Sequence, residues 1–183
     1  MSKRHPVIAV TGSSGAGTTT TGQIFSRMFA TEGLHAAMVS GDSFHRYTRE
    51  QMARLAAKGQ FGERNHFALA ANHIDKLEAL FYDYGHTGNG QYRQYVHDED
   101  QALVKAGHKP GTFTPWGPLP ADTDLLFYEG LHGGVVSETY NIAQYVDLLI
   151  GVVAVSWSVY LLYLGIPIMM NIPEERGFLF STA

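Results

Sequence analysis

Short apolar runs and a helix-period stripe alternate along the N-terminal part of the chain. Val7–Val10 is a continuous apolar run, typical of a short buried strand, and Ala36–Ser40 is a second one. Between them, Thr19–Thr31 predicts a helix, because apolar residues recur there at helical spacing, at Ile24, Phe25, Met28 and Phe29. Strand, helix and strand in this order form a βαβ unit, which implies parallel strands. The pattern therefore predicts an α/β fold, with a mainly parallel sheet flanked by helices.

Later segments extend the same architecture. Thr48–Lys58 predicts a short helix that begins with a capping box, and the glycine- and proline-rich residues 108–122 predict a loop. Ala68–Tyr84 predicts the clearest helix of the chain. Its apolar stripe is interpreted as core, through Ile74, Leu77, Leu80, Phe81 and Tyr84. Asp124–Gly130 and Val146–Val155 predict a third and a fourth strand.

A glycine-rich segment joins the first predicted strand to the first predicted helix. Its glycines allow a turn whose backbone N–H groups all point inward, and the helix N-terminus adds a partial positive charge. Both features favour a bound polyphosphate. The candidate binding residues are Gly12, Ser13, Ser14, Gly15, Ala16, Gly17, Thr18, Thr19 and Thr20.

The spacing of this segment is that of a P-loop, since four residues separate Gly12 from Gly17. Thr18 stands where a P-loop has its lysine, and Thr19 stands at the position of the hydroxyl that binds Mg²⁺. The predicted fold is therefore of the P-loop NTPase type. A plain glycine turn between a strand and a helix remains the alternative.

Two carboxylates follow predicted strands, at the edge where open α/β sheets bind their ligands. Asp42 comes after the second strand, and His45 and Arg49 follow it closely. This grouping suits a phosphorylated alcohol, because Asp42 can accept the hydroxyl proton while His45 and Arg49 hold the phosphate. Glu129 ends the third strand, the place of the acidic residue that orients Mg²⁺ in P-loop enzymes. The alternative is that both carboxylates cap turns and that the basic residues are solvated.

Further polar residues are less decisive. Arg93, Tyr95 and His97 suit either an anion site or local packing, and the sequence does not decide between the two. We expect His66, in a polar loop, to be a surface residue. A zinc site at His97 and Asp98 is not expected, because adjacent residues on a strand point apart and no third ligand is suitably spaced.

Composition narrows the class of protein. The chain has 183 residues, of which 45% are hydrophobic and 16% charged, as in a globular domain with a substantial core. A formal net charge of −4 leaves no basic excess to displace counterions, so nucleic acid is not an expected partner. Cysteine is absent, which excludes disulfides and fits a reducing compartment, and the first apolar run is too short for a signal peptide. We therefore expect a cytoplasmic protein.

Four segments together closely resemble the bacterial class of phosphoribulokinase, within the phosphoribulokinase and uridine kinase family of P-loop kinases. They are GSSGAGTTT at 12–20, GDSFHR at 41–46, YGHTGNGQYRQYVHDED at 84–100 and FYEGLHG at 127–133. Members of that class look like this chain in having a threonine-rich P-loop without lysine. The resemblance implies a Calvin-cycle enzyme that phosphorylates ribulose 5-phosphate with MgATP to give ribulose 1,5-bisphosphate.

The resemblance also assigns roles to residues singled out above. It implies ATP at Gly12–Thr20, Asp42 as catalytic base, sugar-phosphate contacts by His45 and Arg49 with Tyr95 as helper, and Mg²⁺ at Thr19 and Glu129. It further implies a homo-oligomer that responds to NADH.

The resemblance ends after Val155. We expect residues 1–155 to form an incomplete P-loop kinase core, and 156–183 to be the divergent apolar tail of a truncated or frame-shifted product. After Lys109 the only lysine or arginine up to Ala183 is Arg176, so cations that cover the ATP phosphates in the family are missing from this stretch. We therefore predict weak MgATP binding and slow turnover.

The uncharged run Leu148–Met170 is long enough to span a bilayer, which gives the tail a second interpretation. Pro167 within the run and the lack of a basic flank argue against a membrane helix.

Two alternative functions stay open. A uridine-kinase-like nucleoside kinase would share the fold, but a nucleoside brings no phosphate for His45 and Arg49 to bind. A non-catalytic ATP-binding remnant would also share it, and the missing cations argue in its favour.

Overall fold

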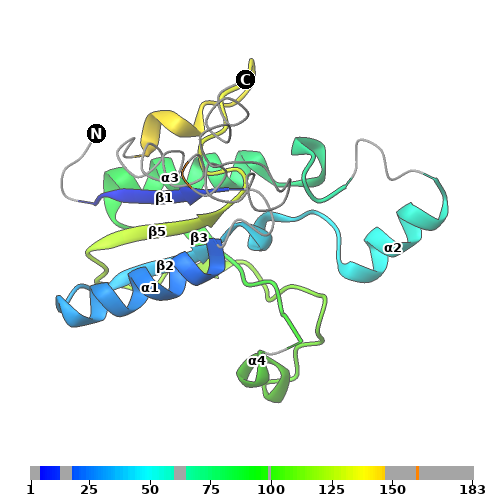
Figure 1. Cartoon of the computed structure of the whole chain (residues 1–183), viewed down its shortest axis with the longest axis horizontal. Coiled ribbons are helices and arrows are strands. Elements are labelled where there is room, and N and C mark those ends of the chain that lie inside the picture. The colour runs from blue at the N-terminus through cyan, green and yellow to red at the C-terminus, as the bar shows by residue number, and fades with distance from the viewer. Residues whose placement is uncertain (1–4, 13–17, 60–64, 99, 147–159, 161–183) are drawn as a thin grey trace, which may run out of the picture. The chain divides into compact units, whose positions relative to one another are not determined.

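The computed structural model describes residues 5–12, 18–59, 65–98, 100–146 and 160 (Figure 1). The chain divides into two compact units, residues 1–147 and 148–183, and the elements named below belong to the first. The predicted fourth strand and the apolar tail lie outside the described residues, apart from Val146 and Tyr160. The boundary at residue 155 therefore stays a prediction. Within the described ranges, no helix has the length and apolar character needed to cross a membrane.

The central sheet of the described part is parallel and has the strand order β1-β5-β2 (Figure 1). Its strands are β1 (Val7–Thr11), β2 (Ala36–Ser40) and β5 (Leu125–Gly130). All three were predicted from their apolar runs, and their parallel pairing confirms the α/β fold. Such runs are continuous because helices cover both faces of a parallel sheet.

Helices and short turns connect the strands. The helices are α1 (Thr18–Thr31), α2 (Arg49–Ala57), α3 (Ile74–Thr87) and α4 (Gln101–Lys105). Turns of 3₁₀ helix are at Gly41–Phe44, Leu69–Ala71 and Ile142–Tyr145, and β3 (Gln91–Tyr92) pairs antiparallel with β4 (Gly117–Pro118).

Aromatic contacts fix α1 and α3 on opposite faces of the sheet. The rings of Phe25 and Phe29 in α1 lie 5.0 and 5.6 Å from the ring of Phe127. Phe81 of α3 instead packs 5.4 Å from the ring of Tyr128. Because successive side chains of a strand point to opposite faces, the sheet is covered on both sides.

The apolar stripe of α1 faces the sheet only in part. Phe29 is 9% exposed, whereas Ile24 and Met28 are each 53% exposed. The periodicity therefore predicted the helix correctly but overstated the width of its buried face.

The start of α3 differs from the prediction. The pattern predicted a helix over Ala68–Tyr84, but the helix begins at Ile74. Residues 71–73 instead pair antiparallel with residues 44–46, through backbone hydrogen bonds of 2.7 and 2.8 Å. These long-range bonds override the high helix propensity of the alanine-rich segment.

The remainder of α3 agrees with the sequence. Its predicted stripe is fully buried, with at most 1% exposure at Ile74, Leu77, Leu80, Phe81 and Tyr84. The helix continues beyond the predicted end at Tyr84 to Thr87, and Gly88 caps it with a φ of 73°, the left-handed conformation typical of a helix C-terminus.

Candidate active site

The carboxyl ends of the three parallel strands meet at one edge of the sheet. Thr11 of β1 is in register with Gly130 of β5, and Ser40 of β2 with Glu129. The Thr11 hydroxyl donates a 2.7 Å hydrogen bond to the carbonyl of Leu131, which ties β1 to the loop after β5. The glycine-rich segment, the turn after β2 and the loop after β5 therefore start from the same edge.

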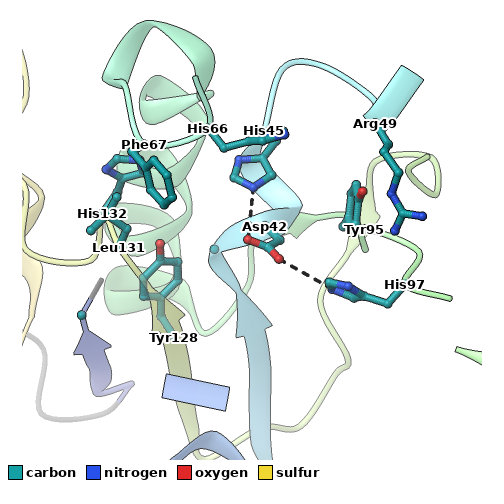
Figure 2. Close-up of a pocket in the computed structure, with 12 residues that line it drawn as sticks. Asp42, His45, Arg49, His66, Phe67, Tyr95, His97, Tyr128, Leu131 and His132 are labelled. Carbon is teal, nitrogen blue, oxygen red and sulfur yellow. Dashed lines mark ion pairs between the residues drawn. The ribbon is translucent and has the colours of Figure 1, made fainter. Parts of the chain in front are cut away.

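A cavity of about 380 Å³ lies at this edge (Figure 2). Its volume is within the range of small-molecule sites, roughly 300–1,000 Å³. The cavity brings together five of the residues predicted from the sequence, namely Gly12, Asp42, His45, Arg49 and Tyr95.

Asp42 lies between two unlike walls of the cavity. In Figure 2, Phe67, Leu131 and Tyr128 lie on one side of its carboxylate. Arg49, Tyr95 and His97 lie on the other side. His132 also lies on the first side, so aromatic and apolar side chains together with one histidine line that side of Asp42, and the Arg49 guanidinium and two further polar rings line the other.

Two imidazoles contact the Asp42 carboxylate, which the 3₁₀ turn after β2 leaves 47% exposed. Nε2 of His45 is 3.1 Å from Asp42 Oδ1, and Nε2 of His97 is 3.7 Å from Asp42 Oδ2 (Figure 2). The hydrogen bond with His45 lowers the pKa of Asp42 by more than partial burial raises it, and the charges of His45, His97 and His66 act in the same direction as that bond. Asp42 is therefore ionised at neutral pH, as a proton acceptor must be.

Arg93 fixes the backbone next to this carboxylate. Its guanidinium donates hydrogen bonds to the carbonyls of Ser43, at 2.9 Å, and His45. The same group stacks on the rings of Phe113 and Trp116, at 3.7 and 4.7 Å from the ring centres. Burial lowers the pKa of Arg93 to about 10. The sequence left open whether Arg93 belongs to an anion site or packs locally, and these contacts support local packing.

Arg49 begins α2, whose predicted capping box is present. Its Nη1 lies 2.9 and 3.0 Å from the two carboxylate oxygens of Asp98, which raises the pKa of Arg49. Both side chains are more than half exposed, so the pair is accessible from solvent. Tyr95 lies nearby, with its ring 4.9 Å from that of His97 and 6.3 Å from that of His45.

Glu129 lines a second cavity, of about 270 Å³, together with Ser40 and Gly22 of α1. Tyr95 and His97 line both cavities, so the two are adjacent. Glu129 thus lies at the predicted edge of the sheet, but it lines the second cavity, whereas Asp42 lines the first.

The glycine-rich segment is described only at its ends. Residues 13–17 lie outside the described residues, whereas Gly12 lines the first cavity and Thr18–Thr20 form the first turn of α1. A Cβ atom on Gly22 would be 3.5 Å from Glu129 Cγ, so α1 passes within van der Waals distance of this carboxylate.

The donor set at this place suits Mg²⁺. The Glu129 carboxylate is a hard oxygen ligand, and Mg²⁺ is commonly held by one or two carboxylates together with substrate phosphates. Among the residues that the structure describes, no three His, Cys, Asp or Glu side chains form a metal-binding group. The residues present therefore fit a magnesium ion that arrives with a nucleotide better than one caged by protein.

Sequence reasoning missed three polar residues of the first cavity and its wall. His66, expected at the surface, lines the cavity with its ring 4.3 Å from that of His45. His132 also lines it, and the completely buried Asn72 lies 3.1 Å from His132 Nε2. His132 belongs to the FYEGLHG segment that carried the resemblance, so that segment could have indicated His132 as a site residue. Asn72 had none beyond being a polar residue in an apolar stretch.

Comparison with solved structures identifies the fold as that of P-loop kinases. The chain superposes on phosphoribulokinase from Rhodobacter spheroides with a TM-score of 0.66 and 43% identity, covering 80% of this chain and 50% of that one. A putative fructose transport system kinase from Silicibacter sp. TM1040 gives a TM-score of 0.55 at 13% identity, over 98% of this chain and 80% of that one. The second likeness concerns the fold alone.

Curated relatives are closer in sequence. The chain is 56% identical over 157 residues to a probable phosphoribulokinase of Escherichia coli (strain K12). It is 52% identical over 158 residues to the chromosomal phosphoribulokinase of Cupriavidus necator. Each alignment covers 85% of this chain and 54% of the relative, so the chain spans about half the length of the curated relatives it matches.

The family model described as Phosphoribulokinase / Uridine kinase family matches residues 7–159. The chain therefore belongs to this family, which confirms the resemblance found in the sequence.

Proposed function

We propose that this chain serves the ATP-dependent phosphorylation of ribulose 5-phosphate to ribulose 1,5-bisphosphate, a reaction of the Calvin cycle. The observation that carries the proposal is the ionised, half-exposed Asp42 carboxylate in a ligand-sized cavity, with the Arg49 guanidinium lining the same cavity. The 56% and 52% identity to phosphoribulokinases supports the choice of substrate.

In the proposed reaction, Asp42 accepts the proton of a substrate hydroxyl. The hydroxyl oxygen then forms a bond to the γ-phosphorus of ATP. The bond between the γ-phosphorus and the β-phosphate oxygen, which lies in line with the new bond, breaks, and ADP is released. His45 and Arg49 hold the phosphate already on the substrate, and Tyr95 assists them. Arg49 already binds the Asp98 carboxylate through its Nη1, so an acidic oxygen group is a ligand that its position allows.

ATP is assigned to Gly12–Thr20 and Mg²⁺ to Thr19 and Glu129. A magnesium ion at this place supplies positive charge to the phosphates as the bond to the leaving group breaks. The contact distance between Gly22 of α1 and Glu129 supports this assignment, since it brings α1 against the carboxylate.

Slow turnover is part of the proposal. The P-loop lacks its lysine, and Arg176 is the only lysine or arginine between Lys109 and Ala183. Since one arginine near the transferred phosphoryl group can contribute ~10³ or more in rate, the shortage of cations in this stretch favours weak MgATP binding and slow turnover. The same observation supports the second candidate, a non-catalytic nucleotide-binding protein.

The test is ADP release by the purified chain with MgATP and either ribulose 5-phosphate or uridine. We expect release with the sugar phosphate, a loss of at least about a hundredfold in Asp42→Asn, and no such loss in Asp83→Asn, an exposed aspartate of α3 that serves as control. ATP binding without turnover would select the non-catalytic alternative, and turnover with uridine the nucleoside kinase. Absence of ATP binding at millimolar concentration would refute the nucleotide site.

We also propose a cytoplasmic location and a homo-oligomeric state. Neither changes the reasoning about the cavity. Light scattering of the purified chain at several concentrations tests the second, and a monomeric mass at each of them would refute it.

A further inference from the structure

The side chain of Asn72 connects the two histidines that flank the cavity. It is completely buried and lies between the 3₁₀ turn Leu69–Ala71 and the start of α3. Its Oδ1 is 2.7 Å from Nδ1 of His45, and its Nδ2 is 3.1 Å from Nε2 of His132. One amide group therefore contacts a ring nitrogen of each histidine.

The orientation of this amide is determined by its backbone partners. Nδ2 of Asn72 donates to the carbonyls of His66 and Ala68, at 2.9 and 2.8 Å. A carbonyl oxygen can only accept hydrogen bonds, so the atom that faces both carbonyls must be the nitrogen. The amide oxygen is therefore fixed toward His45.

This orientation fixes one proton on His45. An amide oxygen only accepts, so Nδ1 of His45 must carry a hydrogen for the 2.7 Å contact to be a hydrogen bond. The remaining nitrogen, Nε2, is the one that lies 3.1 Å from Asp42. His45 can then gain or lose its second proton only at the nitrogen that faces the carboxylate. His66 and Tyr95 are the other titratable groups whose rings face it.

The same orientation has the opposite effect on His132. The two hydrogens of the Asn72 amide are directed to the carbonyls of His66 and Ala68, and the nitrogen has no lone pair, so Nε2 of His132 can join the 3.1 Å contact only as an unprotonated acceptor that shares one of these hydrogens. Burial lowers the pKa of His132, and the charge of nearby His45 acts in the same direction, whereas a backbone hydrogen bond with His66 opposes both. A neutral His132 with an unprotonated Nε2 agrees with the burial of its ring and with the contact to Asn72.

We propose that Asn72 is a positioning residue that sets the protonation pattern of the site, with a permanent proton on Nδ1 of His45 and a neutral His132 whose lone pair is on Nε2. His45 then faces Asp42 Oδ1 through Nε2 alone. The other carboxylate oxygen, Oδ2, lies 3.7 Å from Nε2 of His97 and is the one that accepts the hydroxyl proton. This last consequence rests on the proposed function, but the protonation pattern does not.

Nuclear magnetic resonance of the ring nitrogens tests the pattern directly in the wild-type chain. The sample is the full chain with ¹⁵N-labelled histidine, and single His→Gln variants assign the signals of His45 and His132. At about pH 8, we expect His45 to carry a proton on Nδ1, the nitrogen that faces the amide oxygen of Asn72. His132 is expected to stay neutral with an unprotonated Nε2. A proton on Nε2 of His132 at about pH 8, or a neutral His45 without its Nδ1 proton, would overturn the proposal.

Variants of Asn72 supply a second, directional test. Asn72→Asp replaces the hydrogen-bearing nitrogen with an acceptor, so we expect His132 to take up a proton on Nε2. Asn72→Ala removes both contacts, and His45 is expected to populate both neutral tautomers. Asn89→Ala, at an exposed asparagine after α3, is the matched control and should leave all ring signals unchanged. An unchanged His132 in a folded Asn72→Asp variant would contradict the inference, and the wild-type measurement stands if neither variant folds.

Kinetics separate this inference from the proposed function. If the chain turns over ribulose 5-phosphate, Asn72→Ala should lower kcat by roughly tenfold to a hundredfold, a part of the ~10²–10⁴ that a general base contributes. KM for the sugar phosphate should rise as well, because His45 also holds the substrate phosphate, although Arg49 is untouched. A pH profile of kcat identical to that of the wild type would refute the positioning role. A chain without turnover would refute the proposed function, while the ring-nitrogen spectra still decide the protonation pattern.

Discussion

Replacement of Arg93 should destabilise the protein although this residue contacts no ligand in the proposed mechanism. The variant Arg93→Met keeps an apolar side chain of similar length against Phe113 and Trp116 but removes the guanidinium. Two hydrogen bonds, to the carbonyls of Ser43 and His45, are then lost.

The expected loss follows from these contacts. Hydrogen bonds that involve a charged group contribute about 1.5–3 kcal/mol each, and a partly exposed cation–π contact about 0.5–1 kcal/mol. The burial that lowers the pKa of Arg93 to about 10 opposes these gains, because it disfavours the charged form. We therefore expect a net loss near the lower end, about 3 kcal/mol in the free energy of unfolding, which corresponds to a fall of roughly 6–12 °C in Tm.

Thermal and urea unfolding, followed by circular dichroism, measure this loss. Arg93→Lys should fall between wild type and Arg93→Met, since lysine keeps the charge but not the planar fork that reaches two carbonyls. The control is Arg54→Met, which removes an exposed pair with Glu50 in α2 and should cost only about 0.3–0.5 kcal/mol. Equal losses in Arg93→Met and Arg54→Met would refute the reasoning.

Two further predictions concern the glycine next to Asp42 and the buried histidines. Gly41→Ala should lower the free energy of unfolding by about 1–3 kcal/mol, because the new Cβ would lie 2.7 Å from the Tyr128 hydroxyl. Gly85→Ala in α3 meets no atom within 4 Å and should raise the free energy of unfolding by about 0.5–1 kcal/mol. Shifts of the unfolding midpoint in the same direction for both variants would contradict this. Burial lowers the pKa of three histidines below the ordinary value of about 6.5, so the unfolded chain binds more protons and the stability should fall as the pH drops through about 6.5. The histidines concerned are His66, His73 and His132. Urea unfolding midpoints measured at about pH 7.5 and about pH 5.5 check this prediction, and equal midpoints at the two pH values would show it to be wrong.

The elements of the fold were predictable where the signal is local. Each of the strands β1, β2 and β5 is a short continuous apolar run, which is visible in the sequence. The buried face of α3 is visible as apolar residues at helical spacing. The start of α3 was not predictable in this way. Its position depends on the backbone pairing of residues 71–73 with 44–46, and an alanine-rich segment gives no indication of a partner so far away along the chain.

The candidate site also contains residues that a local signal predicts and residues that only long-range contacts bring in. Asp42, His45 and Arg49 were found because residues after a parallel strand lie at the ligand edge of the sheet. Asn72 and His66 were not, because a single polar residue acquires a role only through the contacts that tertiary structure supplies. Their partners come from the turn after β2 and the loop after β5, which no local pattern connects.

The pairing of residues 44–46 with residues 71–73 also bears on how such kinases could be redesigned. A chimera that exchanges only the turn carrying Asp42 would keep the backbone bonds to residues 71–73, since any residue other than proline can make them. It would lose the bonds of the His45 and Arg46 side chains to Asn72 wherever the donor turn has other residues there. Redesign of this edge of the sheet is therefore an operation on two separate pieces of sequence that must be drawn from the same donor.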